Sequence, residues 1–169
     1  MGLTVALIVM PTTQAGAGSG GTSLDGSGGS SGCGDARLVD GNAKAPDCAP
    51  RRVKRVIGAA NEITGKRYCY GGGHTRFKSR CYDCSGAVSY ALHGGRFLDS
   101  PMDSSQFMRW ARRGRGDWFT VYANTGHAFL VVAGLRFDTA MVRGDGPGWS
   151  RRIHAENLHD FRHRRKGRF

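Results

Sequence analysis

Apolar residues recur at helical spacing in the first half of the region that follows residue 50. Over 51–64 they repeat every three or four positions, with basic residues on the other side, which predicts an amphipathic helix. A second helix is predicted over about 84–92, ended by two glycines, and a third over 104–113. The glycine-rich segment 68–80, between the first two helices, is predicted to be a loop.

The pattern changes to strands in the second half. Residues 118–122 are rich in β-formers, and the runs 127–133 and 135–139 flank a short glycine turn, which predicts a hairpin. A Gly/Pro loop at 143–148 and a polar tail from residue 151 follow. Helices first and an antiparallel sheet afterwards is the α+β pattern.

Composition divides the 169 residues into three parts. Residues 1–17 join an apolar run to small residues, as a secretory signal peptide does, and the run is too short to span a membrane. The alternative is a disordered apolar N-terminus. Residues 18–32 hold 12 Gly or Ser among 15, so we expect a flexible linker over 18–50. The remainder, 51–169, suits one catalytic domain with a basic C-terminal tail.

The candidate chemistry lies where the loop meets the second predicted helix. Cys84 stands at this helix start, after Asp83, which is a suitable N-cap, and His127 opens a strand. The thiolate is the strong nucleophile, and both a nearby imidazolium and the positive end of a helix stabilise it. The two residues therefore suit a cysteine hydrolase. The alternatives are a buried structural cysteine and a histidine that merely caps a strand.

Four short segments carry a family resemblance. They are RYCYGG at 67–72, DCSG at 83–86, DSSQ at 103–106 and HAFLVV at 127–132. In this order they resemble the NlpC/P60 family of bacterial cell-wall cysteine peptidases, over roughly residues 51–145. The resemblance implies a papain-like α+β fold, with N-terminal helices packed on an antiparallel β-sheet.

By position, the resemblance makes Cys84 the nucleophile and His127 the general base. The third residue lies on the next strand, where Asp138 is the candidate, although the family more often has His. A carboxylate that accepts the Nδ1–H of the imidazole would fix its tautomer and stabilise the imidazolium. Should Asp138 fail in this role, Asn124 is the next candidate.

Further residues are candidates for contact with the substrate. Tyr68 matches the family tyrosine beside the nucleophile, as an oxyanion or substrate contact, on a stretch about four residues longer than usual. Ser104 and Ser105 either contact substrate or only cap a helix. His74, in the lengthened loop, either contacts substrate or is an exposed loop residue.

Five cysteines fit an exported protein with one nucleophile and two disulfides. The four non-catalytic cysteines allow three pairings. We favour local pairing, Cys33 with Cys48 and Cys69 with Cys81, the second of which would clamp the lengthened loop. The alternative is that all five are reduced.

The formal net charge of +12 favours anionic partners. We expect the protein to be a secreted, cell-wall-associated monomer, with peptidoglycan and anionic wall polymers as partners, no nucleic acid partner and no membrane-spanning segment. The tail, 151–169, holds seven basic and two acidic residues, and we expect it to promote retention on the wall. The alternative is simply a solvated basic surface.

The function expected from the resemblance is hydrolysis of amide bonds in peptidoglycan stem peptides, with no metal or organic cofactor. The alternatives are amidase or acyltransferase action on another substrate and a non-catalytic wall-binding module. A zinc knuckle that binds nucleic acid is a further alternative, because Cys69, His74, Cys81 and Cys84 are metal-ligand types at short spacing.

Overall fold

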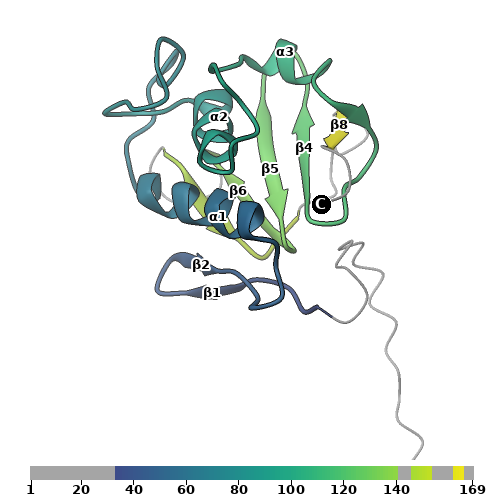
Figure 1. Cartoon of the computed structure of the whole chain (residues 1–169). Coiled ribbons are helices and arrows are strands. Elements are labelled where there is room, and N and C mark those ends of the chain that lie inside the picture. The colour runs from purple at the N-terminus through teal and green to yellow at the C-terminus, as the bar shows by residue number, and fades with distance from the viewer. Residues whose placement is uncertain (1–32, 141–145, 154–161, 166–169) are drawn as a thin grey trace, which may run out of the picture.

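The computed structural model describes residues 33–140, 146–153 and, for the backbone, 162–165. The expected signal peptide and the Gly/Ser segment lie outside this part of the chain. In Figure 1 two helices cover one face of a sheet, and a small hairpin lies beneath the first helix. The elements are β1 (Arg37–Val39), β2 (Asn42–Lys44), α1 (Arg51–Ile63), α2 (Cys84–Gly94), α3 (Ser104–Phe107), β3 (Arg112–Arg113), β4 (Phe119–Ala123), β5 (Ala128–Val132), β6 (Leu135–Asp138), β7 (Gly148–Ser150) and β8 (Arg162–Arg165).

The α+β architecture predicted from the sequence is confirmed. The helices α1 and α2 pack against each other, and α2 also packs on β5 and β6. The apolar stripe of α1 is buried, as its helical spacing predicts. The sheet is antiparallel, in the order β3-β8-β4-β5-β6-β7. Alternation along its strands places Leu135 and Phe137 in the core and sends Arg136 and Asp138 to the other face.

The third predicted helix is shorter than the apolar pattern indicates. It spans only α3, which a capping box between Asp103 and Gln106 starts. The chain then turns through a left-handed residue, Ala111 at φ 53°, into β3. The apolar residue that extended the helical pattern, Trp110, packs instead on Phe107 and on Phe119 of the sheet. Tertiary packing of this aromatic side chain therefore replaces the last turns of the predicted helix.

The expected polar tail contributes a strand. The backbone of β8 pairs with both β4 and β3, so β8 lies inside the sheet order and not beyond it. Its sequence is RHRR, without an apolar position. Strand pairing uses backbone N–H and C=O groups, which is why a pattern search based on apolar side chains overlooks such a strand.

The segment expected to be a linker also carries structure. Its hairpin, β1 with β2, is fastened to α1 by Asn61, whose side chain accepts from the N–H of Ala43 (3.0 Å) and donates to its C=O (2.9 Å). A disulfide joins Cys33 to Cys48 beside the hairpin. Among the described residues, no helix is long and apolar enough to cross a membrane.

Candidate active site

The first turn of α2 presents the candidate nucleophile. The carboxylate of Asp83 accepts a hydrogen bond from the N–H of Gly86 (2.7 Å), so α2 begins at Cys84, as predicted. Cys84 is the one cysteine of the five that forms no disulfide. It is partly exposed, so a substrate can reach a thiol held at the positive end of a helix.

A tight turn before β5 carries the candidate base. The side-chain oxygen of Asn124 accepts hydrogen bonds from the N–H groups of Gly126 (2.9 Å) and His127 (2.8 Å). The N–H of Asn124 in turn donates to the C=O of His127 (3.0 Å). Asn124, the reserve candidate for the third catalytic position, therefore shapes the turn that holds the histidine, and its oxygen is already occupied.

The candidate third residue lies directly beside the histidine. The Nε2 atom of His127 is 2.9 Å from Oδ1 of Asp138, whose side chain is fully buried. The sequence-based expectation was that the carboxylate would face Nδ1, and this is wrong. Because Nε2 faces Asp138, Nδ1 is left for the thiol. The short turn between β5 and β6 brings the two residues to the same end of neighbouring strands.

A buried arginine supports the carboxylate from behind, and the sequence reading overlooked it. Arg136 donates through both Nε (3.0 Å) and a terminal nitrogen to Oδ2 of Asp138, and its guanidinium lies 3.8 Å from the ring centroid of Phe129. The other oxygen, Oδ1, accepts from the N–H groups of Thr139 (2.6 Å) and Ala140 (3.2 Å). The period-two spacing of Arg136 and Asp138 was the signal that could have identified this pair.

The surroundings favour a charged imidazole. Burial alone would lower the pKa of His127, but hydrogen bonds and charge interactions with Asp138 and Cys84 outweigh it and raise this pKa to about 9. Burial likewise acts to raise the pKa of Asp138, but the pairing with His127 and Arg136 lowers it below the ordinary carboxyl value. At neutral pH this favours an imidazolium between a carboxylate and the thiol.

The candidate substrate residues lie around this centre to different degrees. Tyr68 is 41 % exposed, and burial, followed by the charges of Cys84 and Asp83, raises the pKa of its phenol. Ser104 donates to the C=O of Thr125 (3.2 Å) and so ties α3 to the turn before His127. Ser105 is partly exposed in the first turn of α3.

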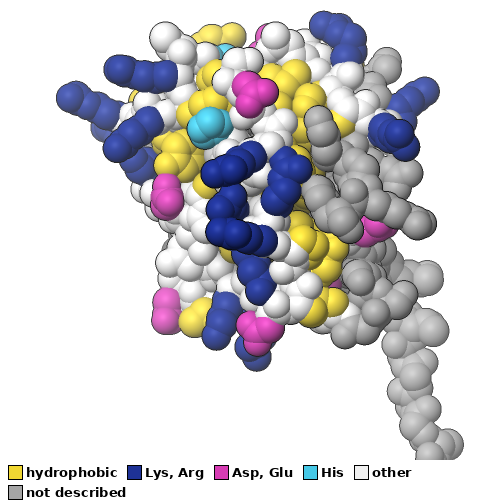
Figure 2. Space-filling model, viewed as in Figure 1, with side chains coloured by type: hydrophobic (Ala, Val, Ile, Leu, Met, Phe, Trp, Pro, Cys, Tyr) yellow, Lys and Arg dark blue, Asp and Glu magenta, His cyan; other side chains and the backbone are white. Residues whose placement is uncertain are grey.

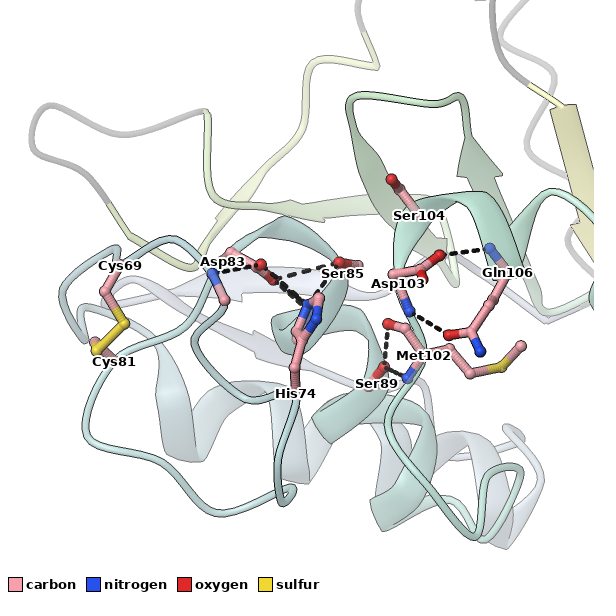
Figure 3. A network of polar contacts seen from close by, with 12 residues as sticks. Cys69, His74, Cys81, Asp83, Ser85, Ser89, Met102, Asp103, Ser104 and Gln106 are labelled. Atoms are coloured by element: carbon pink, nitrogen blue, oxygen red, sulfur yellow. Dashed lines mark hydrogen bonds and ion pairs between the residues drawn. A yellow bond between two sulfur atoms is a disulfide. The ribbon is translucent and has the colours of Figure 1, made fainter.

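A second histidine, His74, reaches the start of α2 from the loop side (Figure 3). The Nε2 atom of His74 lies 3.0 Å from Oδ1 of Asp83 and 3.0 Å from Oγ of Ser85. The sequence reading considered only a contact with substrate or simple exposure for this residue. The structure adds that His74 belongs to a polar network with Asp83 and Ser85, the residues directly before and after Cys84.

The predicted disulfide pairing is confirmed by the two bonds, Cys33–Cys48 and Cys69–Cys81. With Cys69 and Cys81 joined to each other, the zinc-knuckle alternative loses two of its four ligands. Within the described part of the chain, no group of three or more His, Cys, Asp or Glu side chains is placed to hold a metal ion.

Comparison with solved structures identifies the fold. The chain is similar to the peptidoglycan hydrolase RipB of Mycobacterium tuberculosis, with 21 % identity, 72 % of this chain and 70 % of that chain covered, and a TM-score of 0.52. It is similar to the P60 domain of the antigen MAP1204 of M. avium subspecies paratuberculosis, with 18 % identity, 68 % and 94 % covered, and a TM-score of 0.51.

A third similar structure separates fold from activity. RipD of M. tuberculosis, described as a non-catalytic NlpC/p60 domain protein adapted to peptidoglycan binding, matches at 18 % identity, with 69 % and 98 % of the two chains covered and a TM-score of 0.51. No protein-family model and no curated protein matched the chain. The fold is therefore that of NlpC/P60 domains, which occur both in peptidoglycan hydrolases and in a non-catalytic binder.

Proposed function

We propose that this protein is a secreted cysteine peptidase that hydrolyses amide bonds in peptidoglycan stem peptides, with Cys84, His127 and Asp138 as its catalytic triad. The observation that carries the proposal is the position of His127, which interacts with the buried carboxylate of Asp138 on one side and with Cys84 on the other. A protein that only binds peptidoglycan needs no such arrangement. The arrangement requires the charged carboxylate of Asp138 to be buried, which is unfavourable for folding.

The chemistry follows from the geometry. The thiolate of Cys84 attacks the carbonyl carbon of the amide, and the N–H groups at the start of α2 stabilise the oxygen that becomes negative. The first N–H groups of a helix have no partner within it, and the cap from Asp83 uses that of Gly86. The N–H of Cys84 itself is therefore available to the oxyanion, with the phenol of Tyr68 as a second donor.

Proton transfer completes the cycle. Protonated His127 donates its Nδ1 proton to the leaving amine as the carbon–nitrogen bond breaks, which leaves a thioester on Cys84. Water then attacks the thioester, while His127 accepts one of its protons and returns it to the departing sulfur. The carboxylate of Asp138 stays ionised throughout, because Arg136 and two backbone N–H groups hold it.

Digestion of purified peptidoglycan, with mass spectrometry of the fragments, tests the proposal directly. We expect stem peptides cut at one type of amide bond, and loss of cutting after Cys84 is alkylated with iodoacetamide. Every other cysteine is in a disulfide, so alkylation modifies this residue alone. Intact stem peptides after prolonged digestion would contradict the proposal.

Wall binding without catalysis is the second candidate, and the basic surface together with RipD favours it. Figure 2 shows a band of Lys and Arg side chains over the helical face of the molecule. A cavity of about 580 Å³ is lined in part by Arg55, Lys78 and Arg96. We assign anionic wall polymer to this surface as a partner of the peptidase, because such clustered cations attract polyanions. The two disulfides suit the secreted location.

The surface can be tested apart from catalysis. Reversing charge with Lys78→Glu and Arg96→Glu should weaken sedimentation with insoluble walls at low salt and leave cleavage of a soluble stem peptide unchanged. The same reversal at the exposed Arg37 and Lys44 of the hairpin is the matched control. Equal loss of sedimentation in both double variants would mean that net charge alone, and not this surface, determines binding.

A further inference from the structure

His74 contacts the residues on both sides of the nucleophile. Its Nε2 atom lies 3.0 Å from each carboxylate oxygen of Asp83 and 3.0 Å from the hydroxyl oxygen of Ser85. Ser85 in turn donates to Oδ1 of Asp83 (3.3 Å). Figure 3 shows the imidazole entering this network from the loop, while the carboxylate and hydroxyl belong to the start of α2.

The carboxylate in this network caps the nucleophile helix. Asp83 is only 5 % exposed, and its oxygens also accept from the N–H groups of Gly86 (2.7 Å) and Gly71 (3.1 Å). A buried carboxylate needs several donors to offset its lost hydration. Without the imidazole, the carboxylate loses a donor and is freer to turn away from Gly86, and the first turn of α2 loosens.

The loop reaches the helix because glycines allow the two backbones to approach. The N–H of Asp83 donates to the C=O of Gly72 (3.1 Å). A Cβ atom on Gly86 would lie 1.9 Å from that same carbonyl oxygen, so no other residue fits there without a shift of the backbone. Gly73, which follows Gly72 in the chain, has a φ of 87°, a left-handed conformation that glycine adopts easily and that precedes His74.

A disulfide closes this loop at its base. Cys69 and Cys81 are joined, and Cys69 bonds through its backbone to Tyr82 (N–H to C=O, 3.3 Å) and to Gly72 (C=O to N–H, 3.0 Å). The bond thereby fastens both ends of the segment that carries His74. Neither cysteine belongs to the proposed triad, so any influence of the disulfide on Cys84 is indirect.

We infer that His74 is a positioning residue for Cys84, and that the Cys69–Cys81 disulfide supports the same role. The imidazole fixes the carboxylate of Asp83, the carboxylate fixes the first turn of α2, and that turn aims the thiol. The inference rests on the proposed function only where it concerns turnover. The reactivity of the thiol toward a small alkylating agent depends on the same geometry and needs no substrate.

The first test compares His74→Ala with His74→Gln, whose side-chain amide can still donate to Asp83. For His74→Ala we expect kcat on a soluble stem peptide, and the rate of Cys84 alkylation by iodoacetamide, to fall about tenfold, since small misplacements of reacting groups are costly. KM should change little, and His74→Gln should recover most of both rates. Arg76→Ala, an exposed residue of the same loop, is the control and should resemble wild type.

The second test asks whether the disulfide acts through His74. Cys69→Ala with Cys81→Ala should lower the two rates about as much as His74→Ala does, and combining all three changes should add little, as for residues that act as a unit. Cys33→Ala with Cys48→Ala removes the other disulfide and should leave both rates unchanged. If the disulfide-free loop prevents folding, the link to the disulfide is abandoned, and the His74 variants with both disulfides intact still decide the positioning role of His74.

The outcomes separate this inference from the proposed function. Wild-type rates in His74→Ala, or equal losses in His74→Ala and His74→Gln, would overturn the positioning role. Fully additive losses in the triple variant would overturn the link to the disulfide. If wild type fails to cleave any stem peptide but its alkylation rate still depends on His74 as described, then the proposed function fails and the positioning role stands.

Discussion

Two histidine–aspartate pairs flank Cys84, and they are built in opposite ways. His127 directly precedes β5 and Asp138 ends the neighbouring strand β6, and their 2.9 Å contact involves a carboxylate side chain with no exposure. His74 and Asp83 come from a loop and a helix cap, with a 3.0 Å contact and an imidazole that is 33 % exposed. Sheet register positions the first pair, whereas glycine contacts and a covalent bond position the second. The geometry around Cys84 therefore depends on regular and irregular structure together.

Replacing the thiol between the pairs should have the largest effect. We expect Cys84→Ala to lower cleavage of stem peptides by several orders of magnitude, because the sulfur forms the new bond to carbon. The fold should persist, since the start of α2 is held by Asp83 and not by the thiol. Activity assays with circular dichroism of the variant check both points, and wild-type digestion by Cys84→Ala would exclude the mechanism.

Replacing the aspartate of each pair with asparagine should then show which pair contributes more to kcat. Asp138→Asn should lower kcat by about three orders of magnitude, because an amide facing Nε2 can favour the wrong tautomer. Asp83→Asn should cost far less, because asparagine also caps helices well. Steady-state kinetics of the two variants measure the difference. A larger loss in Asp83→Asn would make the loop-side pair the more important one and reverse the comparison.

The two pairs should also differ in how much the contacts around them contribute to the free energy of unfolding, and substitution of the buried Arg136 tests this. Arg136→Met leaves the buried carboxylate of Asp138 without one of its two cationic partners, and removing one member of a buried ion pair costs about 3–5 kcal/mol. His74→Ala should destabilise much less, since its pair is partly exposed. Urea unfolding of both variants gives the two free energies. Equal losses in the free energy of unfolding would show that the ion pair between Arg136 and Asp138 contributes little to stability.

The pH dependence of stability should be the subtlest difference. The pKa of His127 is raised from 6.5 to about 9, so its pairing stabilises the folded state fully below pH 6.5. This contribution should disappear as the pH rises through about 9. Melting temperatures measured across this window should fall in wild type and stay flatter in Asp138→Asn. Asp83→Asn is the control, and it should retain the wild-type slope.

The sequence predicted secondary structure well where apolar side chains repeat regularly. It predicted poorly where an element is held by backbone pairing or ended by tertiary packing. The apolar stripe of α1, the start of α2 at Cys84 and the hairpin of β5 and β6 all follow from periodicity and capping. The strand β8 offered no apolar signal, and the helix expected to continue beyond α3 ended because Trp110 packs on the sheet.

The site shows the same division. Cys84 and His127 could be aligned with known motifs and Asp138 could be chosen by its place on the next strand, and the structure brings His127 and Asp138 into contact. The ring nitrogen that faces the carboxylate depends on the side-chain conformation of His127, which residue spacing does not reveal. The role of His74 depends on a loop whose path is set by glycines and a disulfide, and such a path has no periodic signature.

The position of β8 also bears on how the protein matures. In a chain that leaves the ribosome or a translocation pore N-terminus first, residues 162–165 emerge after every other described strand. Until they arrive, the edge of β4 is unpaired, and β3 joins the sheet through β8. An open strand edge invites pairing with other chains. Late closure of this edge would delay completion of the six-stranded sheet until residues 162–165 have emerged.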